Sequence, residues 1–180
     1  MSLTLFCAIT LPDEIADLLE DMQRGLDGAG WRPRENFHIT LRYFGEMSEP
    51  DAEELDLALA RIPCPPLTLS LAGVGSFGGN DPHAVWAGVR PNEALSLLSK
   101  RCSSAARLLG IPSDKHPFRP HVTLAYLKGI SPAAVAAYAQ RHCIFESPPF
   151  EVGEFGLYSR HHGKRYSRYI EEAAYPLTIG

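Results

Sequence analysis

Phe37-His38-Ile39-Thr40-Leu41-Arg42-Tyr43-Phe44-Gly45 is matched, 83 residues further on, by Pro120-His121-Val122-Thr123-Leu124-Ala125-Tyr126-Leu127. Both stretches have the apolar, partly β-branched character of strands. Side chains alternate across a strand, so His38 and Thr40 share one face, and His121 and Thr123 share the equivalent face. Each stretch is therefore predicted to be a strand with an apolar core face and a polar face that carries one imidazole and one hydroxyl.

The segments around each copy follow the same order of elements. In the first half we expect a strand over 3–10, a helix from Pro12 that ends at Gly28 and Gly30, a strand over 37–44, a helix capped by Ser48, a strand over 67–71 and a glycine-rich loop over 73–82. In the second half we expect a strand over 84–89, a helix capped by Asn92 and ended by Gly110, a strand over 121–127, a helix from Ser131-Pro132, and strands over 150–158 and 166–174.

The order β-α-β-α-β therefore occurs twice. With 180 residues, of which 45% are apolar, the chain can form one domain with a sizeable core. We predict an α+β fold in which residues 1–180 form a single bilobal domain. Its first repeat covers about residues 1–75 and its second about residues 84–180, and a pseudo-two-fold axis relates them.

The overall charge limits the class of partner. The formal net charge is −4 at pH 7, whereas proteins that bind long duplex nucleic acid are usually basic. This balance still allows a site that binds one or two phosphates at a strand end. The four cysteines are scattered without metal-binding spacing, and no signal peptide or membrane-spanning run is apparent. We therefore predict reduced thiols, a cytoplasmic location and no membrane association.

The repeated histidine and threonine predict a particular chemistry. A lone strand histidine is most often a hydrogen-bonded structural residue, but packing gives no reason to repeat both residue types at the same spacing. If the pseudo-symmetry brings the two strands together, two imidazoles and two hydroxyls face one cleft. One imidazole could then act as general base and the other as general acid, while the hydroxyls donate hydrogen bonds to phosphate oxygens. Opening a cyclic phosphodiester needs these groups and no metal.

Two H-x-T-L motifs, one in each half, resemble those of the 2H phosphoesterase superfamily. The chain is similar to its branch of RNA 2′,3′-cyclic phosphodiesterases of the LigT or ThpR type, also called 2′-5′ RNA ligases. The residues that carry this similarity are Phe6 with Leu11-Pro12, Trp31, Glu35 to Leu41, Phe44-Gly45-Glu46, Phe77 to Val89, Arg119 to Ala125 and Leu157-Tyr158-Ser159. The resemblance covers nearly the whole chain and implies two antiparallel sheets that flank a central cleft, with helices outside.

The same resemblance implies an activity and roles for the histidines. The activity is metal-independent hydrolysis of an RNA 2′,3′-cyclic phosphate end to a 2′-phosphomonoester, with reversible 2′-5′ ligation of RNA ends as a second reaction. Carried over to this chain, the resemblance makes His38 the proton donor and His121 the proton acceptor. The repeat makes the two sites nearly equivalent, so the exchanged assignment stays open.

Three residues beside the motifs are candidates for substrate binding. On strict alternation Arg42 and Phe44 follow Thr40 on the polar face, and Arg119 precedes His121 by two residues. The two arginines are candidates for phosphate binding, and the alternative is that they are solvated charges. Phe44 is a candidate for stacking on a base, and the alternative is packing between the lobes.

A basic stretch follows late in the chain. Residues 158–168 contain six basic side chains and no acid, with tyrosines between them. Tyr158 and Arg160 are its candidates for substrate binding. The stretch could hold RNA next to the reacting phosphate, or it could be an exposed hairpin turn.

The residues leave three functions open. The first is the RNA-end phosphodiesterase, the second a phosphodiesterase for a small cyclic nucleotide or an ADP-ribose cyclic phosphate, and the third a non-catalytic module that binds RNA ends. We predict the first, because both motifs are intact and the basic stretch favours RNA. The predicted partner is an RNA end with a 2′,3′-cyclic phosphate, such as a tRNA fragment. We further predict a monomer with no cofactor and no metal.

Overall fold

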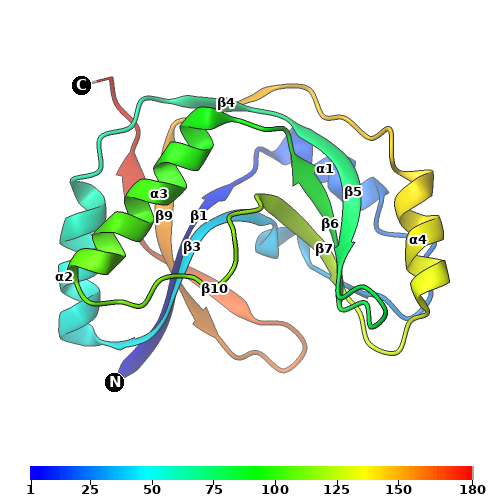
Figure 1. The fold of residues 1–180 in the computed structure, drawn as a ribbon, viewed down its shortest axis with the longest axis horizontal. Coiled ribbons are helices and arrows are strands. Elements are labelled where there is room, and N and C mark those ends of the chain that lie inside the picture. Colours follow the sequence, from blue (N-terminus) through cyan, green and yellow to red (C-terminus); the bar gives the residue numbers. More distant parts are fainter. Residues whose placement is uncertain (180) are drawn as a thin grey trace.

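A computed structural model describes residues 1–179 and contains two four-stranded sheets (Figure 1). The first has the strand order β10-β9-β1-β3 and the second the order β2-β7-β6-β5. The bounds are Ser2–Thr10 for β1, Gly30–Trp31 for β2, His38–Ser48 for β3, Leu71–Phe77 for β5, Ala84–Val89 for β6, His121–Tyr126 for β7, Glu154–His161 for β9 and Arg168–Pro176 for β10. Every pair within them is antiparallel, which confirms the predicted fold class.

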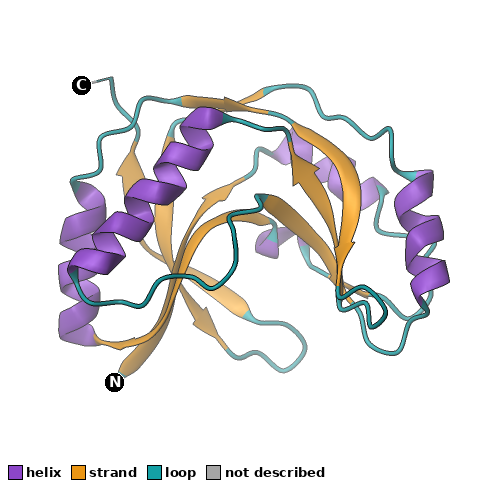
Figure 2. Ribbon diagram, viewed as in Figure 1, coloured by secondary structure: helices purple, strands orange, loops and turns teal. Residues whose placement is uncertain are grey.

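Four α-helices lie on the outer sides of the two sheets (Figure 2). They are α1 (Asp13–Asp21), α2 (Glu49–Ala60), α3 (Glu93–Leu108) and α4 (Pro132–Arg141), and a 3-10 turn, η1, covers Arg34–Asn36. Helices α2 and α3 pack on the first sheet, while α4 packs on β5 of the second and α1 lies on that side too (Figure 1). No helix in residues 1–179 is both long and apolar enough to cross a membrane.

The two lobes exchange strands in a symmetric way. β5, which ends the first half of the chain, pairs with β6 in the second sheet, and β9, which forms a hairpin with the last strand β10, pairs with β1 in the first. The two crossing segments pair with each other through β4 (Leu67–Leu69) and β8 (Phe150–Val152). The sheets therefore do not follow the predicted division into residues 1–75 and 84–180, because the first sheet takes β9 and β10 from the second half and the second sheet takes β2 and β5 from the first.

Local sequence signals place the starts of three helices correctly. Ser48, Asn92 and Ser131 are N-caps whose side chains each accept a hydrogen bond from the backbone N–H three residues on. Such a bond satisfies one of the amide groups that the first turn leaves without a partner. Gly110, at φ 75°, follows the end of α3 in the left-handed conformation that glycine adopts readily.

Three predicted boundaries are wrong. The first helix ends at Asp21, because the chain turns before Gly28 is reached. Residues 73–77 belong to β5 and not to a loop, since Gly75 leaves the space that the Trp86 ring of β6 fills: a Cβ there would lie 2.5 Å from ring atoms. The strand predicted over 150–158 is divided at Gly153 into β8 and β9, which belong to different sheets.

Candidate active site

The two motif strands carry the same irregularity. In the pairing of β3 with β1 the register skips Leu41, and in the pairing of β7 with β6 it skips Leu124. An extra residue of this kind is a β-bulge, and it moves the following side chains to the opposite face of the strand. From the histidine to the sixth residue after it, the order of buried and accessible residues is identical in the two copies.

The bulges decide which side chains follow the threonines on the cleft face. Tyr43 is 46% exposed and Tyr126 is 49% exposed, and both line the pocket between the sheets. Strict alternation placed Phe44 there instead. Phe44 is 7% exposed and belongs to the core, so its predicted stacking on a base is wrong and the packing alternative is right. The signal for the tyrosines was present, because tyrosine recurs five residues after each histidine.

Arg42 is also displaced by the bulge and is only 5% exposed. Its Nη2 donates to the carbonyl of Pro112, and its Nη1 lies 3.4 Å from Asp114 Oδ2. Its Nε has no hydrogen-bond partner within residues 1–179. The guanidinium thus fastens the segment around 112–114 to β3, and this placement does not support the phosphate-binding role predicted for Arg42.

The two histidine rings are held in the same way. His38 Nδ1 lies 2.7 Å from the carbonyl oxygen of Asn36, and His121 Nδ1 lies 2.7 Å from the carbonyl oxygen of Arg119. A carbonyl oxygen only accepts, so Nδ1 is the protonated nitrogen in each neutral ring. Nε2 of both rings is therefore left to exchange protons with a bound molecule.

Both His-Thr pairs line one pocket between β3 of the first sheet and β7 of the second. This catalytic pocket has a volume of about 170 Å³ and is lined by His38, Thr40, His121 and Thr123 together with Phe6, Arg32, Asn36, Tyr43, Tyr126, Arg160 and Tyr169. The predicted meeting of two imidazoles and two hydroxyls in one cleft therefore holds. Within residues 1–179, no group of three or more His, Cys, Asp or Glu side chains is arranged to hold a metal ion.

Aromatic rings surround His38. The centroids of the Phe6 and Tyr169 rings each lie 5.1 Å from its centroid, the Tyr169 ring edge-on. Burial lowers the pKa of His38 from 6.5 to about 4; the hydrogen bond to Asn36 opposes this shift, and the charge of the nearby His121 adds to it. In the ligand-free protein His38 is accordingly neutral at physiological pH.

His121 has an equivalent pair of aromatic neighbours. The Phe77 ring lies edge-on at 4.9 Å and the Trp86 ring is tilted at 5.8 Å. Burial lowers its pKa below 6.5, the hydrogen bond to the Arg119 carbonyl opposes the shift, and the Arg119 guanidinium lowers it further by charge repulsion. Arg119 is exposed and lines a larger pocket that also contains His121.

The two late candidates occupy different positions. Arg160 lines the catalytic pocket, on the cleft face of β9. Tyr158 stacks on Phe6, with ring centroids 5.7 Å apart, and donates a hydrogen bond to Glu171 Oε2 at 2.9 Å. Burial, and then the bond to this carboxylate, raise the pKa of the Tyr158 hydroxyl. Tyr158 therefore supports the aromatic wall behind His38.

Sequence reasoning missed Arg32, which closes one end of the catalytic pocket. Its guanidinium carbon lies 4.8 Å from the ring centroid of Tyr126 and 4.9 Å from that of Tyr166, on the β9–β10 hairpin. Asn36 Nδ2 also donates to the carbonyl of Ser167 in the hairpin. Arg32 thus joins the two lobes through cation–π contacts. No repeat partner marked it in the sequence.

Comparison with known proteins identifies relatives over most of the chain. The family model described as the 2′-5′ RNA ligase superfamily matches residues 11–164. The RNA 2′,3′-cyclic phosphodiesterase of Escherichia coli (strain K12) is 31% identical, and the alignment covers 97% of this chain and 96% of that protein. The protein of the same name from Geobacillus stearothermophilus is 32% identical over 96% of this chain, which spans 56% of that relative's length.

Solved structures agree with this assignment. The crystal structure of E. coli LigT complexed with 3′-AMP superposes with a TM-score of 0.81 and 28% identity, covering 99% of this chain and all of the other. The crystal structure of TT0787 of Thermus thermophilus gives a TM-score of 0.78 at 26% identity, with 97% of each chain covered.

Proposed function

Because the chain belongs to the 2′-5′ RNA ligase superfamily, we propose that it hydrolyses RNA 2′,3′-cyclic phosphate ends to 2′-phosphomonoesters. The observation that carries this proposal is the duplicated geometry of His38 and His121. Both rings have Nδ1 bound to a carbonyl and Nε2 free, and both line one small pocket with Thr40 and Thr123. A pair of imidazoles is what acid–base opening of a cyclic diester requires.

In the proposed hydrolysis, water is the nucleophile and attacks phosphorus while the bond from phosphorus to O3′ breaks. His121 Nε2 takes the proton from water, and His38 Nε2 gives a proton to O3′, so that the product keeps its phosphate on O2′. The Thr40 and Thr123 hydroxyls donate hydrogen bonds to the non-bridging oxygens as charge builds up on them. Arg160, which lines this pocket, and Arg119, which is exposed on the adjoining larger pocket, supply positive charge.

His38 must gain a proton for this role, although its ligand-free pKa is about 4. A bound phosphate anion beside the ring favours the imidazolium and raises that pKa. The proposal needs no metal, and ligation through a 2′-5′ linkage is the same displacement of O3′ with a 5′-hydroxyl in place of water. We further propose that the protein acts as a monomer in the cytoplasm.

The test uses a saturating concentration of an oligoribonucleotide that ends in a 2′,3′-cyclic phosphate, incubated with EDTA between about pH 5 and 9. We expect turnover to a 2′-phosphate end, with a rate that falls on both sides of an optimum because one histidine must be neutral and the other charged. A 3′-phosphate product, or activity that disappears with EDTA and returns with a divalent metal, would overturn the proposed mechanism. Binding of the oligonucleotide without turnover would favour a non-catalytic module.

A further inference from the structure

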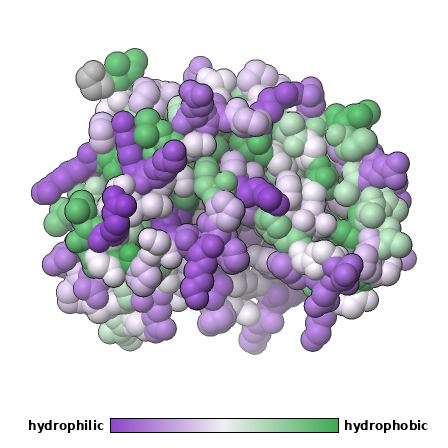
Figure 3. Space-filling model, in the orientation of Figure 1, coloured by the Kyte–Doolittle hydropathy of each residue, from purple (hydrophilic) through white to green (hydrophobic). Residues whose placement is uncertain are grey.

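A second, larger pocket opens from the catalytic pocket. It has a volume of about 1050 Å³, and the two pockets share Thr40, Tyr43 and His121. One wall is α3, another is the segment 113–119, and the turn between β5 and β6 contributes Phe77, Gly78 and His83. We name this pocket the α3 groove. It lies on the face that Figure 1 presents, where the middle of the surface is mostly hydrophilic (Figure 3).

The face of α3 that lines the groove is basic and hydroxyl-rich. Lys100, Ser103, Ser104 and Arg107 follow the i, i+3, i+4, i+7 spacing of one helical face, and all four line the groove. The opposite face is buried in the core and consists of Leu95, Leu98, Cys102, Ala105 and Ala106. Neither Lys100 nor Arg107 forms an ion pair within residues 1–179. Core packing therefore does not explain this face.

The groove is positively charged, although the chain as a whole has a negative net charge. Lys100, Arg107 and Arg119 line it in a protein whose net charge is −4. Within the described chain its single acidic lining residue is Asp114, which is paired with the buried Arg42. Three cations with one compensated acid make a local positive field that attracts anions.

Aromatic side chains stand among these cations. Tyr43, at the junction of the two pockets, is 46% exposed, and Phe118 on the 113–119 wall is 37% exposed. Phe77 lines the opposite wall beside His121. A basic groove with exposed aromatic rings is the arrangement by which proteins hold single-stranded nucleic acid, since cations meet phosphates and rings stack on bases.

From this arrangement we propose that the α3 groove binds the single-stranded RNA that leads into the cyclic end. The inference rests on the proposed function. A 2′,3′-cyclic phosphate occupies the 3′-terminal nucleotide, so the remaining nucleotides lie on its 5′ side. They leave the catalytic pocket past Tyr43 and His121, and their phosphates meet Lys100 and Arg107 while Ser103 and Ser104 donate hydrogen bonds. The groove makes the enzyme prefer oligonucleotides over cyclic mononucleotides.

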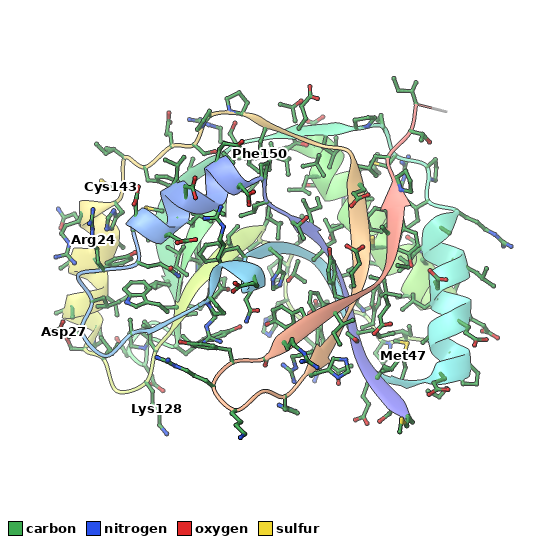
Figure 4. The ribbon with its side chains drawn as sticks, turned by 180° about the vertical axis from the view of Figure 1, so that it is seen from behind. Arg24, Asp27, Met47, Lys128, Cys143 and Phe150 are labelled. Atoms are coloured by element: carbon green, nitrogen blue, oxygen red, sulfur yellow. The ribbon has the colours of Figure 1, made fainter. Side chains whose placement is uncertain are left out.

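The test compares K100Q/R107Q with the matched variant R24Q/K128Q. Arg24 and Lys128 carry the same two charges on the lobe of α1 and α4, outside both pockets (Figure 4). The readout is kcat/KM for a cyclic-ended oligonucleotide divided by kcat/KM for the cyclic mononucleotide. K100Q/R107Q should lower this ratio relative to wild type. We expect that loss to be about 25-fold larger in 0.1 M salt than in 1 M salt, as two lost single-strand phosphate contacts imply. The matched variant should keep the wild-type ratio.

A binding measurement separates failure of this inference from failure of the proposed function. Fluorescence anisotropy with a short labelled oligoribonucleotide that ends in a 2′-phosphate needs no turnover. For K100Q/R107Q we expect the slope of log affinity against log salt to become shallower by about 1.4. If wild type turns over no cyclic phosphate but this change appears, the proposed function fails and the groove remains an RNA site. An unchanged slope, or an equal change in R24Q/K128Q, would overturn the α3 groove assignment.

Discussion

The two halves of the active site share a backbone and differ in their surroundings. Each supplies a histidine anchored through Nδ1 to the carbonyl two residues before it, a threonine, a bulged leucine and an exposed tyrosine. The anchoring residue is Asn36 in one half and Arg119 in the other. Asn36 is buried and tied to the β9–β10 hairpin, whereas Arg119 is exposed and repels a proton on His121.

The comparison distinguishes the residues that occur in both halves of the site from the neighbours that occur in only one. In the proposed reaction the repeated set supplies two proton-transfer groups, each with its Nδ1 held by a backbone carbonyl. Burial lowers the pKa of both imidazoles, that of His38 to about 4 and that of His121 also below its usual 6.5. Two titrating groups with different environments can divide the roles of acid and base.

The largest expected effect comes from removing either repeated histidine. In His38→Ala and in His121→Ala we expect kcat/KM on a cyclic-ended oligonucleotide to fall by about 10²- to 10⁴-fold each, the usual contribution of a general acid or base. The double variant should lose far less than the product of the two single losses, because the pair acts as a unit. Steady-state kinetics measure all three.

The matched control for these variants is His83→Ala, whose ring lies in the α3 groove and not in the catalytic pocket. On the cyclic mononucleotide this variant should stay within a few-fold of wild type. A histidine variant with unchanged kcat/KM, or losses that multiply in the double variant, would show that the two rings do not work as one acid–base pair.

The sequence predicts the repeated part of this site better than the unrepeated part. His38, Thr40, His121 and Thr123 could be found because they recur at one spacing, and the strands that carry them follow from alternation. Alternation then failed at Leu41, because a bulge depends on how β1 pairs with β3 and leaves no mark on composition. Arg32 was missed for a related reason: its partners Tyr126 and Tyr166 come from other parts of the chain.

The same limit applies to the fold. Caps at Ser48, Asn92 and Ser131 are local, so the helices begin where the sequence places them. β5 pairs with β6 and β9 pairs with β1, so each of these strands has a partner from the other half of the chain. The alternating pattern of a strand does not indicate which strand it will pair with. The division of the chain at about residue 75 therefore could not account for the composition of the sheets.

The unequal burial of the two rings predicts a pH effect on stability. The folded-state pKa of His38, about 4, lies below the unfolded value of 6.5, so the stability that its burial permits is present above pH 6.5 and is lost as pH falls toward 4. The loss amounts to about 3 kcal/mol, because each pH unit between the two values is worth about 1.4 kcal/mol. Urea unfolding at several pH values should show that His38→Asn removes this dependence, while His121→Asn removes less. An equal effect of the two variants would contradict the pKa order.

The lowered pKa values of the two histidines also predict where on the pH scale the enzyme is most active. Activity needs one neutral and one protonated imidazole, so kcat/KM falls below the lower pKa and above the higher one. Since both pKa values lie below 6.5 in the ligand-free protein, we expect the maximum of kcat/KM on the acid side of pH 6.5. The maximum of kcat should lie higher, because bound phosphate favours the charged rings. NMR titration with a 2′-nucleotide identifies which ring gains the proton; a larger rise on His121 would exchange the proposed roles.

Arg119 offers a smaller and more local test of the difference. Its guanidinium lowers the pKa of His121, so Arg119→Gln should raise that pKa while the pKa of His38 changes less. If Arg119 holds the phosphate as proposed, the variant should also raise KM for the cyclic phosphate. This increase in KM should become smaller at high salt. Asn36→Asp in the other half is the paired comparison, because it adds a negative charge beside His38 and should raise the pKa of that ring.

The smallest expected effect concerns the two bulges. Ser99 Oγ donates to the carbonyl of Leu41 at 2.8 Å in a buried site, and Gln23 Nε2, in a half-buried site, donates to the carbonyls of Leu124 at 3.1 Å and Arg32 at 2.8 Å. The Leu124 carbonyl also accepts from the backbone N–H of Arg32 at 2.8 Å, so it keeps a partner when Gln23 is changed. We therefore expect Ser99→Ala to lower the free energy of unfolding by about 1–3 kcal/mol, and Gln23→Ala by about 1 kcal/mol or less. Urea unfolding followed by tryptophan fluorescence measures both. The reverse order would mean that the bulge in β7 relies on its side-chain donor more than the bulge in β3 does.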